Sequence, residues 1–112
     1  MNTPKNPRGE VISISTDSLQ NIICDTLFVT KDEIMNRPKI KEKEVVDARK
    51  LAIYIGYTYK HNSYSELQKV YGLNSNQSIE HAIESTRNLL ETDIRFRKKY
   101  DKITERIMCE LI

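Results

Sequence analysis

The fold is decided by the stretch Ser63-Tyr-Ser-Glu-Leu-Gln-Lys-Val-Tyr-Gly-Leu-Asn-Ser-Asn-Gln-Ser-Ile79. Its first Ser, with Glu three positions later, is a capping box and predicts the start of a helix. Gly72 accepts the left-handed backbone conformation that closes a helix, so the helix is expected to stop there. Asn74 is then the predicted cap of a second helix, with Gln77 at the reciprocal position. The stretch therefore predicts a helix, a glycine-containing turn and another helix.

Apolar residues recur at helical spacing on both sides of this stretch. A helix capped by Thr16 and Asp17 is expected first, followed by a short turn that the capping box of Thr30 and Glu33 opens and Pro38 ends. Longer helices are expected over about 44–60 and 93–111, and Val11 to Ser15 are expected to form an extended arm. Gly56, inside a predicted helix, indicates a close approach of another helix. The predicted inward residues are Leu19, Ile22, Ile23, Leu27, Val45, Ala48, Leu51, Ala52, Ile55, Tyr59, Leu67, Val70, Tyr71, Ile79, Ala82, Ile83, Leu90, Phe96, Tyr100, Ile103, Ile107 and Leu111.

The predicted fold class is all-α, a compact helical bundle that contains a helix-turn-helix. A chain of 112 residues has room for about one domain, so we divide it into a flexible N-terminal lead, 1–10, and a single domain, 11–112. The polar N-terminus precedes no long apolar run, so we expect a cytoplasmic protein without a signal peptide or membrane anchor.

No catalytic centre, cofactor or metal site is expected. Cys24 and Cys109 lie far apart and form no CxxC pair, and the chain has only two histidines to join them around a metal. The linear pattern contains no nucleophile with a positioned base and no convincing pair of catalytic carboxylates. An enzyme is therefore the weakest functional class.

The start of the second helix of the motif carries residues suited to reading DNA. In a helix-turn-helix, these residues meet base edges in the major groove of double-stranded DNA. Asn and Gln present a donor beside an acceptor and can bond bidentately to adenine, while Ser bonds several bases or phosphate. The alternative is that the same residues only cap a surface helix. The residues concerned are Asn74, Ser75, Asn76, Gln77 and Ser78.

The net charge of +2 does not by itself demand a polyanionic partner. Basic residues nevertheless dominate 36–50, and a second basic run contains Arg95, Arg97, Lys98, Lys99 and Lys102. Taken singly, each run is also explained as a solvated helix face.

Three segments together resemble a known family. They are Ala48-Arg-Lys-Leu-Ala-Ile-Tyr-Ile, Asn62-Ser-Tyr-Ser-Glu-Leu-Gln-Lys-Val-Tyr-Gly72 and Ile79-Glu-His-Ala82. Their pattern and spacing resemble the C-terminal DNA-binding domain of DnaA-type replication initiators, a TrpR-like helix-turn-helix domain. The resemblance covers about 12–107 and implies an all-helical domain that binds double-stranded DNA.

The resemblance also implies roles for individual residues. Lys41, flanked by Arg37 and Lys39, stands near the arginine that the family inserts into the minor groove. Arg49 and Lys50 fall where the family contacts the DNA backbone, and His81 matches the histidine of the family's His-Ala pair. The helix end that the family sets against a phosphate corresponds here to Ser63, Tyr64 and Ser65.

The departures from the family pattern concern the base-reading segment. The family sequence Gly-Arg-Asp-His-Thr-Thr-Val is replaced by Leu73-Asn-Ser-Asn-Gln-Ser-Ile79, so an altered target sequence is expected. The three glycines Gly9, Gly56 and Gly72 cannot supply a phosphate-cradling loop, so nucleotide binding is not expected.

A protein-interaction module that keeps the helical scaffold without specific DNA binding is the alternative function. Glu80 and Glu84 lie near the predicted reading face and would repel phosphate if they point toward it. A continuous positive surface would favour DNA, and an exposed apolar patch would favour a protein partner.

Overall fold

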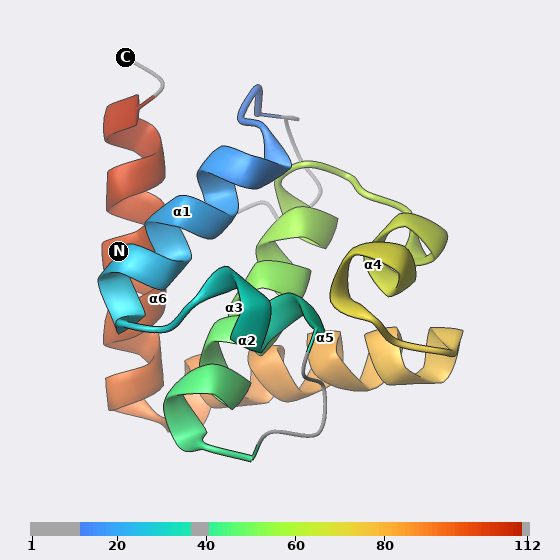
Figure 1. Cartoon of the computed structure of the whole chain (residues 1–112). Coiled ribbons are helices and arrows are strands. Elements are labelled where there is room, and N and C mark those ends of the chain that lie inside the picture. The colour runs from blue at the N-terminus through green and yellow to red at the C-terminus, as the bar shows by residue number, and fades with distance from the viewer. Residues whose placement is uncertain (1–11, 37–40, 111–112) are drawn as a thin grey trace.

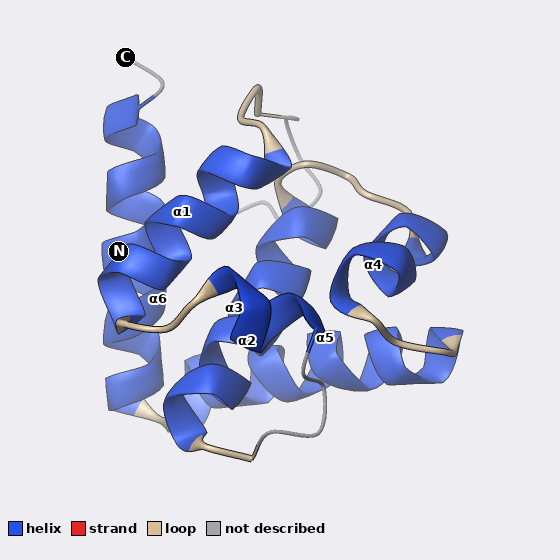
Figure 2. Ribbon diagram, in the orientation of Figure 1, coloured by secondary structure: helices blue, strands red, loops and turns tan. Residues whose placement is uncertain are grey.

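A computed structural model of the chain describes residues 12–36 and 41–110. Several predictions fall outside these residues: the N-terminal lead, and the single residues Arg37, Pro38, Lys39 and Leu111. All regular structure in the described ranges is helical, as predicted (Figure 2). The helices are α1 (Thr16–Leu27), α2 (Lys31–Asn36), α3 (Lys43–Thr58), α4 (Tyr64–Tyr71), α5 (Asn76–Thr92) and α6 (Ile94–Glu110).

Helix α3 occupies the centre of the bundle and contacts α1, α2, α4 and α5 (Figure 1). Helix α6 packs against α1 and α5, on the side of the molecule away from α4. One apolar core joins the helices, and nearly every inward residue that the spacing predicted is buried in it; the predicted Val70 and Leu90 are only half-buried. Residues 12–15, directly before α1, close one end of this core, because Ile14 is buried and the Ile12 amide donates to the Tyr59 carbonyl at 2.9 Å.

The predicted capping boxes are confirmed. Glu66 N donates to Ser63 Oγ at 3.1 Å, and Ser63 N donates to Glu66 Oε1 at 2.8 Å. Thr30 and Glu33 exchange the equivalent two bonds at the start of α2. These bonds satisfy backbone amides that have no partner within the helix.

Two predicted caps are wrong by one or two positions. Ser15, rather than Thr16 or Asp17, caps α1 by accepting from Ser18 N, and Ser75, rather than Asn74, caps α5. In both cases the neighbouring residues are good cap formers, so composition alone did not select the position. The helix predicted over 44–60 runs from Lys43 to Thr58 instead.

The close approach predicted at Gly56 is confirmed, and its cause is α4. A Cβ at Gly56 would lie 3.0 Å from Asn62 Oδ1 and 3.1 Å from Leu67 Cδ2. Glycine at this position lets α4 pack directly on α3.

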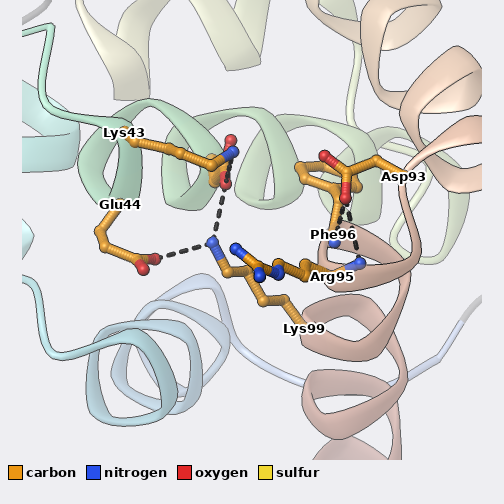
Figure 3. A network of polar contacts seen from close by, with 7 residues as sticks. Lys43, Glu44, Asp93, Arg95, Phe96 and Lys99 are labelled. Carbon is orange, nitrogen blue, oxygen red and sulfur yellow. Dashed lines mark hydrogen bonds and ion pairs between the residues drawn. The ribbon is translucent and has the colours of Figure 1, made fainter.

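A network of charged groups holds the start of α3 against α6 (Figure 3). Lys99 Nζ lies 2.8 Å from Asp47 Oδ2 and 2.9 Å from Glu44 Oε1. Burial opposes the charge on Lys99, but its hydrogen bonds to Asp47 and Glu44 outweigh that effect and raise its pKa. Beside it, Asp93 accepts from Phe96 N and Arg95 N at the start of α6, and the bond from Phe96 lowers the pKa of Asp93.

Buried tyrosine hydroxyls link the helices in the core. Tyr59 and Tyr100 share a hydrogen bond at 2.7 Å, and the Gln20 amide donates to the Tyr71 hydroxyl at 3.4 Å. Burial raises the pKa of Tyr59 and that of Tyr71 to about 12. Burial also raises the pKa of Tyr100.

We therefore expect stability to fall steeply in alkaline solution. The folded-state pKa of Tyr71 lies above its ordinary value of 10.0, so its contribution is intact below that pH and is lost as pH rises toward about 12. Two pKa units correspond to on the order of 3 kcal/mol. Urea unfolding followed by circular dichroism across this range measures the loss. The variant Tyr71→Phe should show a shallower decline, and an equal decline would contradict the assignment to Tyr71.

Candidate nucleic-acid interface

Helices α4 and α5 with the turn between them form the helix-turn-helix predicted from the sequence. Gly72 ends α4 in the left-handed conformation, at φ +65°, and its amide and that of Leu73 both donate to the Gln68 carbonyl. The Gln68 side chain donates across the turn to Asn76 Oδ1. The backbone bonds close the end of α4, and the side-chain bond ties the start of α5 to it.

A groove of about 540 Å³ runs between α3 and the first turns of α5. Helix α5 lies close to α3 here, because Thr86 Oγ1, bonded to the Ala82 carbonyl at 2.7 Å, lies 3.4 Å from the Lys50 carbonyl. The groove brings together six of the predicted site residues, from separate parts of the chain. These are Arg49, Lys50, Ser75, Gln77, Ser78 and His81.

Among the reading candidates that line the groove, Gln77 and His81 have the greatest freedom. They lie one helical turn apart on α5, and both are exposed. Neither side chain makes a hydrogen bond or ion pair with the described part of the chain. Asn76, in contrast, is bonded to Gln68, and Ser75 Oγ accepts from Ser78 N at 3.2 Å. The serines thus also serve the cap of α5.

Arg49 is turned inward rather than toward solvent. Its Nε donates to the Ile34 carbonyl at 3.2 Å and its Nη2 donates to the Glu33 carbonyl at 2.9 Å. The residue is buried at the edge of the groove, and burial lowers the pKa of its guanidinium. In this structure Arg49 holds the last turn of α2 against α3, and the adjacent Lys50 also lines the groove.

The remaining predicted residues border this region from other elements. Lys41 is exposed two residues before α3, and Ser63 and Ser65 are exposed at the start of α4. The carboxylate of Glu66 also lies at this helix end, through the capping box, so a phosphate bound there would share the site with a negative charge. Asn74 is exposed in the turn.

A second hollow of about 530 Å³ adjoins the groove, and Gln77 and His81 line both. Glu80 and Glu84 also line it, which places these carboxylates beside the predicted reading face. Glu84 pairs with Arg87 at 3.6 Å across the surface of α5. Tyr64, another predicted site residue, reaches this hollow, and its ring centroid lies 5.8 Å from that of Tyr57.

Comparison with known proteins found no family model that matches the chain. Curated relatives do match, and all are chromosomal replication initiator proteins DnaA. The chain is 28% identical to DnaA of Nautilia profundicola over 100 residues, which cover 89% of this chain and 22% of that protein. It is 27% identical to DnaA of Bacteroides fragilis over 96 residues, covering 86% and 20% of the two chains. DnaA of Flavobacterium psychrophilum is 28% identical over 103 residues, covering 92% and 20%.

The chain is similar to these DnaA proteins over most of its own length. It spans about a fifth of the length of the curated relatives that it matches. This extent, together with the all-helical fold of residues 12–36 and 41–110 and its helix-turn-helix, is consistent with the DnaA C-terminal domain that the sequence motifs indicated.

The groove between α3 and α5 also has an apolar floor that the site prediction missed. Its members are Val46, Ile53, Leu73 and Ala82. The sequence could have indicated the two members from α3. Val46 and Ile53 share one face of a predicted helix with the site residues Arg49 and Lys50. The second hollow had no linear signal, because Tyr57 and Arg87 meet there only through the packing of α3 on α5.

The described ranges contain no group of three or more His, Cys, Asp or Glu side chains placed to hold a metal ion. Cys24 and Cys109 carry free thiols. None of the helices in 12–36 and 41–110 combines the length and the apolar character needed to cross a membrane.

Proposed function

We propose that this chain binds double-stranded DNA in a sequence-specific manner, as a DnaA-like domain that acts in the initiation of replication, in its regulation or in transcription. Helix α5 would enter the major groove, with Gln77 and His81 at base edges, and the segment around Lys41 would lie at the adjacent minor groove. Residues 11–112 would act as one binding domain in the cytoplasm, without a catalytic role and without a nucleotide.

The observation that carries the proposal is the groove between α3 and α5. It gathers the exposed Gln77 and His81 beside the cation Lys50. Amide and imidazole groups bond base edges, and a lysine bonds phosphate without regard to sequence. The similarity to DnaA supports the same function, because the relatives are named as chromosomal replication initiators.

The first experiment selects a target from a pool of random DNA duplexes at low and at moderate salt. We expect a sequence motif to be enriched. The affinity of the protein for duplexes that carry this motif should fall steeply as salt rises, because phosphate contacts release counterions. The absence of any retained duplex at low salt would contradict the proposal.

Two variants separate base reading from backbone contact. Gln77→Ala should cost about 1–3 kcal/mol at particular base pairs of the selected site and little on unrelated duplexes. Lys50→Ala should weaken binding to all duplexes alike and lower the salt dependence by about one phosphate contact. Fluorescence anisotropy with matched and substituted duplexes measures both effects. Equal losses on every duplex for Gln77→Ala would remove Gln77 from the reading role.

Binding to a protein through the same surface is the second candidate function. It is favoured by Glu80 and Glu84, which line the hollow shared by Gln77 and His81 and would repel a phosphate placed there. The variant Glu80→Gln discriminates between the candidates: it should strengthen DNA binding if the reading face meets DNA, and it should leave DNA binding unchanged if that face serves a protein.

A further inference from the structure

Three large apolar side chains remain exposed in the described residues: Phe28, Ile94 and Met108, at 92%, 72% and 41% of their surface. Phe28 is the most unusual of them. It follows α1 with φ +58°, a left-handed conformation that is unfavourable for a bulky L residue. The fold therefore holds an aromatic ring in solvent, in a conformation that is strained for this type of residue.

A hollow of about 470 Å³ lies directly beside Phe28. Leu27 and Phe28 of the α1 end form one wall, and Lys98, Lys102 and Glu105 of α6 contribute to the other. A protruding ring and an adjacent hollow on one surface are the two parts of a self-complementary contact. In a two-fold dimer, the ring of each copy can enter the hollow of the other.

The exposed apolar residues of α6 belong to the same surface. Ile94, Lys98, Glu105 and Met108 are spaced by four, seven and three residues, so they share one face of the helix. The hollow beside Phe28 lies at the middle of this face, because Lys98 and Glu105 line it.

The charges on this face fall into paired and unpaired groups. Lys99 is held by Asp47 and Glu44, and Asp101 accepts from Arg97 Nε at 3.3 Å. Lys98, Lys102 and Glu105 form no ion pair with any described residue. One carboxylate and two ammonium groups are therefore available to a partner around Phe28.

We infer that this face joins two copies of the chain in a two-fold dimer, with their α6 helices antiparallel. These residues are arranged almost symmetrically about Asp101. Lys98 lies three residues before it and Glu105 four residues after it, while Ile94 and Met108 lie seven residues before and after it. An antiparallel arrangement therefore sets Lys98 of one copy opposite Glu105 of the other, and Ile94 opposite Met108, twice over. The two Asp101 carboxylates approach the axis, and each is already neutralised by Arg97 of its own helix.

The dimer goes beyond the proposed function and does not depend on it. Its expected consequence for DNA is two α5 helices related by the same two-fold axis, which would read two half-sites of inverted sequence. The dimer itself is tested without DNA, so its failure and a failure of DNA binding are separate results.

The test is sedimentation of the purified chain from micromolar to millimolar concentration. The wild-type chain should pass from monomer to dimer. Phe28→Gly should weaken dimerisation about 30-fold or more, as expected for a central aromatic contact. Gly adopts the left-handed conformation freely, so this variant should unfold at no lower temperature than the wild type. Loss of the dimer with an intact fold supports the proposal.

Charge reversal tests the register. Glu105→Lys alone and Lys98→Glu alone each place like charges opposite one another and should both be monomers. An equimolar mixture of the two variants restores both attractive pairs and should form heterodimers. Three results would overturn the proposal: a wild-type chain that stays monomeric at millimolar concentration, a mixture that forms no heterodimer, or a dimer unaffected by Phe28→Gly.

Discussion

Replacing Asp47 by Ala should lower the free energy of unfolding by about 3–5 kcal/mol, as expected when one partner of a buried ion pair is removed. Asp47 is 3% exposed, and its Oδ2 accepts from Lys43 Nζ at 3.1 Å and from Lys99 Nζ at 2.8 Å. The Lys99 side chain is 18% exposed, so the variant would leave it a poorly hydrated charge with Glu44 as its acidic partner. Urea unfolding at neutral pH measures the loss.

The matched control is Asp17→Ala, which breaks the ion pair of Asp17 with Lys31 at the surface. Solvent screens an exposed ion pair and leaves it little net effect, so this variant should remain close to the wild type. Asp47→Asn retains the shape and the acceptor oxygen, and its loss should fall between the two. Similar losses for Asp47→Ala and Asp17→Ala would show that the network around Lys99 is not the tie between α3 and α6.

Leu67→Ala should cost about 2–5 kcal/mol and loosen α4 on α3. Leu67 is buried, and it faces the space above Gly56, so its removal leaves a cavity at the contact between the two helices. Because the turn after α4 sets the start of α5, the variant should also weaken DNA binding beyond its effect on stability. Thermal unfolding and duplex titration on the same sample separate the two effects.

Gly56→Ala provides the control through a double-mutant cycle. Alone, the added Cβ meets Leu67 Cδ2 at 3.1 Å, and packing must shift to accept it. In the Leu67→Ala background that contact is absent and only Asn62 Oδ1, 3.0 Å from the added Cβ, remains, so the helix propensity of Ala should recover up to about 1 kcal/mol. Identical effects of Gly56→Ala in both backgrounds would mean that the close approach of the two residues has no energetic weight.

Much of the fold could be predicted from local patterns. The capping box at Ser63, the stop at Gly72 and the apolar spacing around Phe96 and Ile103 each report on residues within one or two helical turns. Such interactions depend on neighbours in the chain and are therefore legible in the sequence. The cap of α5 was misplaced by one residue, because Asn74 and Ser75 are equally good candidates and the chosen geometry follows the tie between Gln68 and Asn76.

The candidate site was predicted less completely than the fold. The residue types around Gln77 and His81 are visible in the sequence, as is the likeness to DnaA. The orientation of Arg49 is not, because the carbonyls that it bonds belong to α2, about fifteen residues earlier in the chain. A basic residue on a helix is ordinarily expected at the surface, and the pattern offered no reason to bury this one.

By itself the sequence determined an all-helical chain with a helix-turn-helix and the residue types at the start of its second helix. Helical spacing, caps and turn glycines act through short-range sterics and hydrogen bonds, so they are written in neighbouring residues. The tertiary structure decided which of the charged side chains remain available to contact another molecule. It buried Asp47 and Arg49 in internal bonds, left Lys50 at the groove, and held Phe28 in solvent beside a hollow. Those outcomes depend on contacts between segments far apart in the chain, and a local sequence pattern cannot predict the energies of such contacts.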